Sequence, residues 1–209
     1  MSARPATRST LIWVGLAAAL VVPLAVSATS PLLAWREPVY VAAGLAGVIG
    51  LCLLLVQPLL AGGALPGLTA RRSASIHRVI GVALVAAVLV HVGGLWLTSP
   101  PDVVDALLFR SATPFSIWGV LAMWAVTGTA LLALTRRRVP VRTLRVAHTT
   151  LAAVTVAGTI AHALLIDGTM GQLSKVMLCV LVATATARVI LIKKAWRARA
   201  GTPARAPTR

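Results

Sequence analysis

Six long apolar stretches decide what this chain can fold into. A helix needs about 20 mostly apolar residues to cross about 30 Å of hydrocarbon, and six segments meet or approach that length: 11–28, 39–60, 76–98, 114–134, 144–166 and 173–192. The runs are continuously apolar and rich in Ala and Leu, without the alternation expected of a membrane β-barrel. With 58% hydrophobic and 11% charged residues, the composition excludes a soluble globule. We therefore predict an all-α, polytopic membrane bundle of six transmembrane helices over residues 11–192.

The charges lie in the connections and alternate between the two sides of this bundle. The net charge is +16, and all Lys and Arg residues except Arg36, Arg110 and Lys175 fall on one predicted side. The acids fall on the other side: Glu37, Asp102, Asp105 and Asp167. Because cytoplasmic loops are enriched in Lys and Arg, we predict a multi-pass protein of the inner (plasma) membrane with both termini in the cytoplasm. The basic excess then indicates topology and some affinity for anionic lipid, not nucleic-acid binding.

The two ends of the chain are predicted to be tails. Residues 1–10 form a cytoplasmic N-terminal tail, and residues 193–209, rich in Arg, Ala, Pro and Thr, form a basic, disordered cytoplasmic tail. The first apolar stretch also resembles a cleavable signal peptide. Its removal would leave five spans without reversing any later helix.

All four histidines lie in the third and fifth stretches, as His77 and His91 and as His148 and His162. Both pairs have a spacing of fourteen. Fourteen helical residues turn through about 1400°, close to four full turns, and rise about 21 Å. Each pair therefore projects from one face of its helix. Since both helices run in the same direction, we predict two layers of two imidazoles: His77 with His148 near the cytoplasmic boundary, and His91 with His162 deeper in the membrane.

Two opposed imidazoles suit haem better than a bare metal ion. A zinc or iron site made only of protein usually needs three or four ligands, and no carboxylate accompanies either layer. Cys52 and Cys179 lie in apolar runs and form no haem-attachment motif. A porphyrin leaves two axial positions that one His from each helix would fill, and Arg71, Arg72, Arg78 and Arg145 lie where they would pair with propionates. We predict two b-type haems, with one haem or purely structural histidines as alternatives.

These residues resemble the ferric reductase-like transmembrane domain family over roughly residues 60–166. In that family, histidines about fourteen apart on two helices ligate two stacked b haems, and His77, His91, His148 and His162 match those positions. The segment from Arg78 to Gly81 is similar to the family's Arg-x-x-Gly element, and Pro114-Phe115 to the start of its next helix. The resemblance implies an oxidoreductase component for electron transfer, with no catalytic side chain assigned.

The electron donor and acceptor are expected to be separate molecules. No G-x-G-x-x-G motif and no soluble flavin or nicotinamide domain follows the last stretch. A separate reductase, supplying any flavin, or a membrane quinol would then be the donor, and the acceptor on the outer side is not specified. A second candidate is the haem-binding membrane subunit of a periplasmic methionine sulfoxide reductase system. The histidine set of that subunit lacks the inner histidine of the third helix, which is present here as His77. A non-redox transporter or a scaffold is the alternative of another class.

Overall fold

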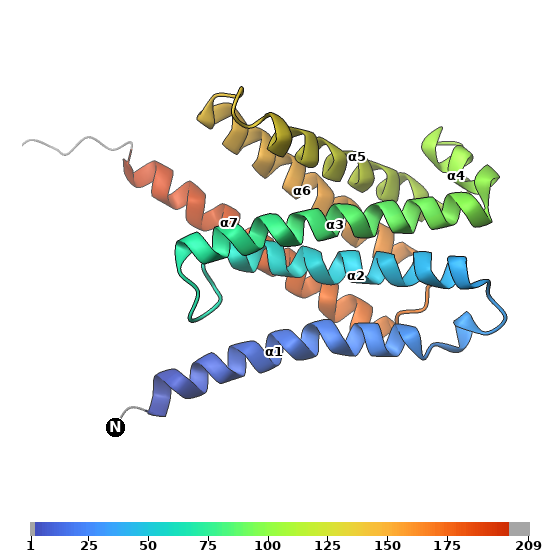
Figure 1. Ribbon diagram of the computed structural model, residues 1–209, viewed down its shortest axis with the longest axis horizontal. Helices are drawn as coiled ribbons and strands as arrows, with labels where there is room; N and C mark the ends of the chain where they lie inside the picture. Colours follow the sequence, from blue (N-terminus) through green and yellow to red (C-terminus); the bar gives the residue numbers. More distant parts are fainter. Residues whose placement is uncertain (1–2, 201–209) are drawn as a thin grey trace, which may run out of the picture.

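A computed structural model describes the backbone of residues 3–200 and the side chains of residues 6–192, and these residues form a bundle of α-helices (Figure 1). The elements are α1 Ala3–Ala28, the 3-10 turn η1 Pro31–Leu33, α2 Pro38–Ala61, α3 Ala70–Thr98, α4 Pro100–Leu107, α5 Pro114–Thr135, α6 Val141–Leu165 and α7 Gln172–Ala200. Within the described chain, six of these helices are long and apolar enough to span a membrane. The predicted all-α fold with six spans is confirmed.

The structure differs from the predicted tails and connections in three places. Helix α1 begins at Ala3, inside the predicted N-terminal tail, and α7 continues to Ala200, through residues 193–200 that we predicted to be disordered. The Lys, Arg and Ala residues of that segment are good helix formers, so the helix continues beyond the apolar span, which ends at Ile192. The remainder of that predicted tail, residues 201–209, lies outside the described residues. Helix α4 is the third difference, and it begins with prolines at positions where the missing N–H costs nothing.

Helix α2 is the centre of the bundle. It packs closely against α3 and also contacts α1 and α7, while α5 packs closely against α6 and α6 contacts α7. The principal core cluster joins buried residues of α2, such as Leu51 and Leu55, to Val156 of α6 and to Leu178 and Val182 of α7. The bundle therefore contains two tight helix pairs, α2 with α3 and α5 with α6, which α7 connects.

Small residues allow each tight pair to approach closely. A Cβ added at Gly94 of α3 would lie 2.7 Å from Ala43 Cβ of α2. A Cβ added at Gly158 of α6 would lie 2.9 Å from the Trp118 carbonyl oxygen of α5. Close backbone approach at small residues is a common way of packing helices in membranes. It brings side chains of α3 and α6 within reach of main-chain groups on the neighbouring helix.

The two ends of the bundle differ in charge, because all four acids lie at one end and most of the cations at the other. The start of α1, the α2–α3 and α5–α6 connections and the end of α7 lie at one end, and α4 lies at the other (Figure 1). The first end, here called the basic end, carries Arg71, Arg72, Arg78, Arg136, Arg137, Arg138, Arg142, Arg145 and Arg188. The opposite end, here called the acidic end, carries Glu37, Asp102, Asp105 and Asp167. That the basic end faces the cytoplasm stays a prediction from the charge rule.

Candidate haem-binding site

The four histidine rings meet in two layers between α3 and α6. In the inner layer, nearer the basic end, the ring centres of His77 and His148 are 6.2 Å apart and their planes differ by 68°. In the outer layer, the ring centres of His91 and His162 are 6.3 Å apart and their planes differ by 79°. The structure thus brings together the pairs that the fourteen-residue spacing predicts.

Each outer histidine reaches a main-chain carbonyl on the neighbouring helix. His91 Nδ1 lies 2.8 Å from the Ala43 carbonyl oxygen of α2, and His162 Nδ1 lies 2.9 Å from the Phe115 carbonyl oxygen of α5. The Phe115 ring also contacts His162 edge to face, with ring centres 5.6 Å apart. A carbonyl oxygen can only accept, so Nδ1 carries the proton and donates it. In the neutral imidazole, Nε2 then keeps a free electron pair for a metal.

The inner layer is held differently. His77 Nδ1 lies 3.3 Å from the Gln57 carbonyl oxygen of α2, and Gln57 Nε2 donates in return to the His77 carbonyl oxygen at 3.3 Å. His148 is exposed, whereas the other three histidines are half-buried. The inner layer is therefore the more open of the two.

The spacing of the rings suits one metal atom between each pair. A metal–imidazole nitrogen bond is about 2.0 Å and a ring centre lies about 1.1 Å behind its nitrogen, so two imidazoles on opposite sides of one metal have centres about 6.2 Å apart. Both layers match that separation. Helices α3 and α6 make few direct contacts, since each packs mainly on its own partner. The residues present therefore fit a planar macrocycle with two axial histidines in each layer.

No alternative metal site competes with these layers in the described part of the chain. Residues 6–192 contain no group of three or more His, Cys, Asp or Glu side chains placed to hold a metal ion. Cys52 and Cys179 are free and buried in the core. A two-histidine layer has too few donors for a protein-only metal site, and it suits a group that brings its own equatorial ligands.

The arginines predicted to pair with propionates lie at the basic end, beside the inner layer in sequence. Arg71, Arg72, Arg78 and Arg145 are all exposed. Arg78 follows His77 directly, and Arg145 precedes His148 by one helical turn. The structure therefore places all four near the inner layer along their helices, and their pairing with a propionate remains a proposal.

Sequence reasoning missed the groups that orient the histidines. These are the carbonyls of Ala43, Gln57 and Phe115, the Gln57 side chain, and the glycines that leave room beside them, Gly47 and Gly119. A main-chain carbonyl has no residue signature. The sequence contained one indirect signal. Gly47 and Gly119 lie in the second and fourth apolar stretches, at nearly the same number of residues before His91 and His162, respectively.

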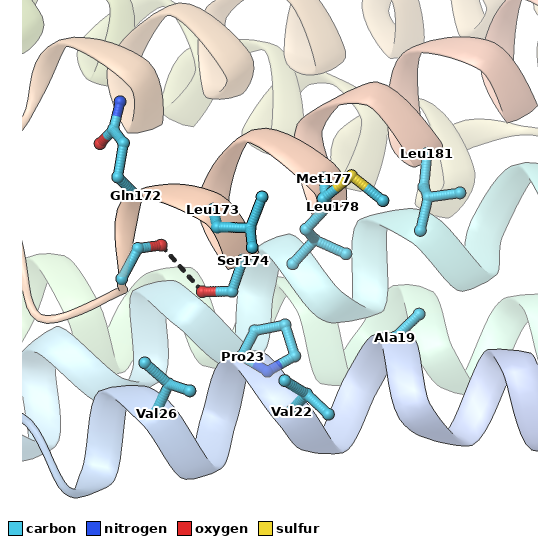
Figure 2. A pocket seen from close by; sticks show the side chains of 11 residues that line it. Ala19, Val22, Pro23, Val26, Gln172, Leu173, Ser174, Met177, Leu178 and Leu181 are labelled. Carbon is cyan, nitrogen blue, oxygen red and sulfur yellow. Dashed lines mark hydrogen bonds between the residues drawn. The ribbon is translucent and has the colours of Figure 1, made fainter.

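A groove elsewhere on the bundle is separate from the histidines. It has a volume of about 460 Å³ and lies between α1 and α7 (Figure 2). Its lining is mostly apolar, including Val22, Met177 and Leu181, and no histidine contributes to it. The Ser174 hydroxyl donates its proton to the Gly171 carbonyl oxygen at 2.9 Å. The groove therefore adds nothing to the redox site.

A bundle of membrane-spanning helices with two layers of paired histidines defines a class of polytopic membrane protein suited to bis-histidine haem. Residues 43–159, more than half of the chain, match the model of the ferric reductase like transmembrane component family. The chain belongs to this family, which implies transmembrane electron transfer. The match includes His77, His91 and His148, and it ends three residues before His162. Neither the curated proteins nor the solved structures gave a significant match.

Proposed function

We propose that this protein carries electrons across the membrane through two b-type haems, with His77 and His148 as axial ligands of one and His91 and His162 of the other. The observation that carries the proposal is the pair of nearly equal ring separations, 6.2 and 6.3 Å, at two depths of the same helices. The layers lie about 21 Å apart along each helix, from a rise of 1.5 Å per residue. Two haems at that spacing would divide electron transfer across the bilayer into shorter steps.

The side chains of this protein bind and orient, and they perform no covalent chemistry. Bound haem supplies a one-electron redox couple in each layer. The carbonyl contacts of His77, His91 and His162 hold each ring by Nδ1 and leave Nε2 for iron. A haem held by two histidines would be suited to electron transfer rather than to binding of oxygen. Arg71, Arg72, Arg78 and Arg145 would pair with the propionates of the inner haem.

The direction of transfer follows from the charge distribution. If the basic end faces the cytoplasm, electrons enter at the inner layer from a separate reductase or a membrane quinol and leave at the outer layer. Exposed arginines at that end would favour docking of an acidic reductase, which would supply any flavin. The outer acceptor would be a ferric species or an oxidised periplasmic protein. The protein would then act in the inner (plasma) membrane as the haem subunit of an oxidoreductase.

The stoichiometry of haem tests this proposal directly. The purified protein in detergent should give a reduced-minus-oxidised spectrum of b-type haem, and a pyridine haemochrome assay should give two haems per chain. A folded, colourless protein from cells supplied with haemin would contradict the proposal. A single haem would contradict the assignment of two layers. Reconstitution with reduced flavin or quinol, and with ferric chelate or an oxidised periplasmic protein, would then separate the candidate donors and acceptors.

A further inference from the structure

Two helical glycines lie directly against the imidazoles of the outer layer. A Cβ at Gly47 would lie 3.0 Å from His91 Nδ1 and 3.1 Å from its Cε1. A Cβ at Gly119 would lie 2.7 Å from His162 Nδ1 and 3.0 Å from its Cε1. Each glycine stands four residues after the carbonyl that its histidine contacts, Ala43 or Phe115. The same arrangement therefore occurs once in each tight helix pair.

Helix geometry explains why glycine is required there. The Cα–Cβ bonds of a helix tilt toward its N-terminus, so a side chain at position i+4 lies over the carbonyl of residue i. Thr127 and Thr129 of α5 illustrate this, because their hydroxyls bond the carbonyls four residues earlier at 2.9 and 2.8 Å. A glycine at i+4 leaves the second lone pair of that carbonyl open from the side. An imidazole from the neighbouring helix can then reach it.

We propose that Gly47 and Gly119 are positioning residues for the outer haem, each opening a helix carbonyl to the Nδ1–H of the histidine opposite and so fixing the orientation of both axial imidazoles. The inference rests on the proposed haem function. The chain uses the arrangement twice, with separations of 48 and 47 residues between each histidine and its carbonyl. An added Cβ would lie closer to the histidine at Gly119 than at Gly47, so the two sites should respond unequally to an added methyl group.

The test replaces each glycine with alanine and measures how the outer haem is held. Alanine is intrinsically favoured over glycine in a helix, so a loss of binding would arise from the contact with histidine. Loss of groups that orient metal-bound histidines typically weakens binding 10- to 100-fold. Gly119→Ala should therefore release one of the two haems to apomyoglobin at least about 10-fold faster than the unaltered protein. Gly47→Ala, with its larger clearance, should show a smaller increase.

A spectroscopic signature separates positioning from general destabilisation. The planes of His91 and His162 differ by 79°, and near-perpendicular imidazoles give a strongly anisotropic low-spin ferric signal in electron paramagnetic resonance. Both variants should shift that signal for one haem and leave the other unchanged. Gly44→Ala is the matched control on α2, since its Cβ would meet nothing within 4 Å. Gly128→Ala is the matched control on α5, where the added Cβ would lie 3.4 and 3.5 Å from side-chain atoms of Leu151.

The outcomes distinguish this inference from the function on which it rests. If the unaltered protein holds two haems and both Gly119→Ala and Gly47→Ala keep its spectrum and release rate, the positioning role is overturned and the haem function stands. If the unaltered protein binds no haem, both the positioning role and the haem function are overturned. If Gly119→Ala does not fold, Gly47→Ala still decides, because its clearance of 3.0 Å requires only a small displacement of the ring.

Discussion

The outer and inner histidine layers have the same ring spacing but different supports. In the outer layer, both rings are half-buried and bond helix carbonyls at 2.8 and 2.9 Å. In the inner layer, His77 meets its carbonyl at 3.3 Å and His148 is exposed. The same separation between imidazoles therefore occurs with half-buried rings and with an exposed one. The more open layer is the one beside the basic end, where the proposed donor would approach.

The difference between the layers begins in the sequence of α2 and α5. Gln57 stands fourteen residues after Ala43 and bonds the main chain of His77. Thr129 stands fourteen residues after Phe115, but its hydroxyl bonds the Ala125 carbonyl of its own helix at 2.8 Å. The two helix pairs therefore repeat each other at the outer layer, while at the inner layer the side chains of Gln57 and Thr129 have different partners.

The largest expected effect comes from removing a ligand from one layer at a time. His162→Ala should abolish the outer haem, and His148→Ala the inner haem, because a porphyrin held by one axial imidazole is bound far more weakly. The haemochrome assay should fall from two haems to one in each variant, with a different spectrum remaining. Thr149→Ala, next to His148, is the control and should retain both haems. If either histidine variant keeps two haems, the pairing into layers is wrong.

A smaller effect is expected at the support of the outer end of α6. Lys175 is 3% exposed, and its Nζ donates to the Ile166 carbonyl oxygen at 2.8 Å, one turn beyond His162. Lys175→Met would leave that carbonyl without its donor and remove a cation from the C-terminus of a helix, which should cost about 1–3 kcal/mol. The measurement is the midpoint of thermal unfolding in detergent.

The control for Lys175 is its neighbour Ser174, which is half-buried and whose hydroxyl donates to the Gly171 carbonyl oxygen within the same turn. Ser174→Ala should leave the unfolding midpoint nearly unchanged. Equal midpoints for the two variants would show that the lysine does not stabilise the outer layer's helix.

The smallest effect is expected from Gln57→Leu in the inner layer. The change removes the bond from Nε2 to His77, but it also removes Oε1, a buried oxygen with no partner among the described residues. The two contributions oppose each other, so the free energy of unfolding should fall by less than about 1.5 kcal/mol. Any change in the haem spectrum should be confined to the inner haem. Gln172→Leu, at an exposed glutamine of α7, is the control, and a shift of the outer haem in Gln57→Leu would contradict the separation of the layers.

Much of the fold and the pairing of the histidines could be predicted from the sequence. Spans follow from length and hydropathy, and four histidines at equal spacing on parallel helices lead to two layers. The orienting groups could not be predicted. The Ala43 and Phe115 carbonyls become partners only because Gly94 and Gly158 let the helices approach closely, which is a property of packing. Lys175, predicted to lie in the outer region, is buried there because it meets the end of α6.

The main-chain contacts of the outer rings have a consequence for maturation. With Nδ1 engaged by Ala43 or Phe115 within each helix pair, the reactive nitrogen of each imidazole is chosen before any cofactor is delivered. Loading the apoprotein would then require no change of tautomer at either outer imidazole.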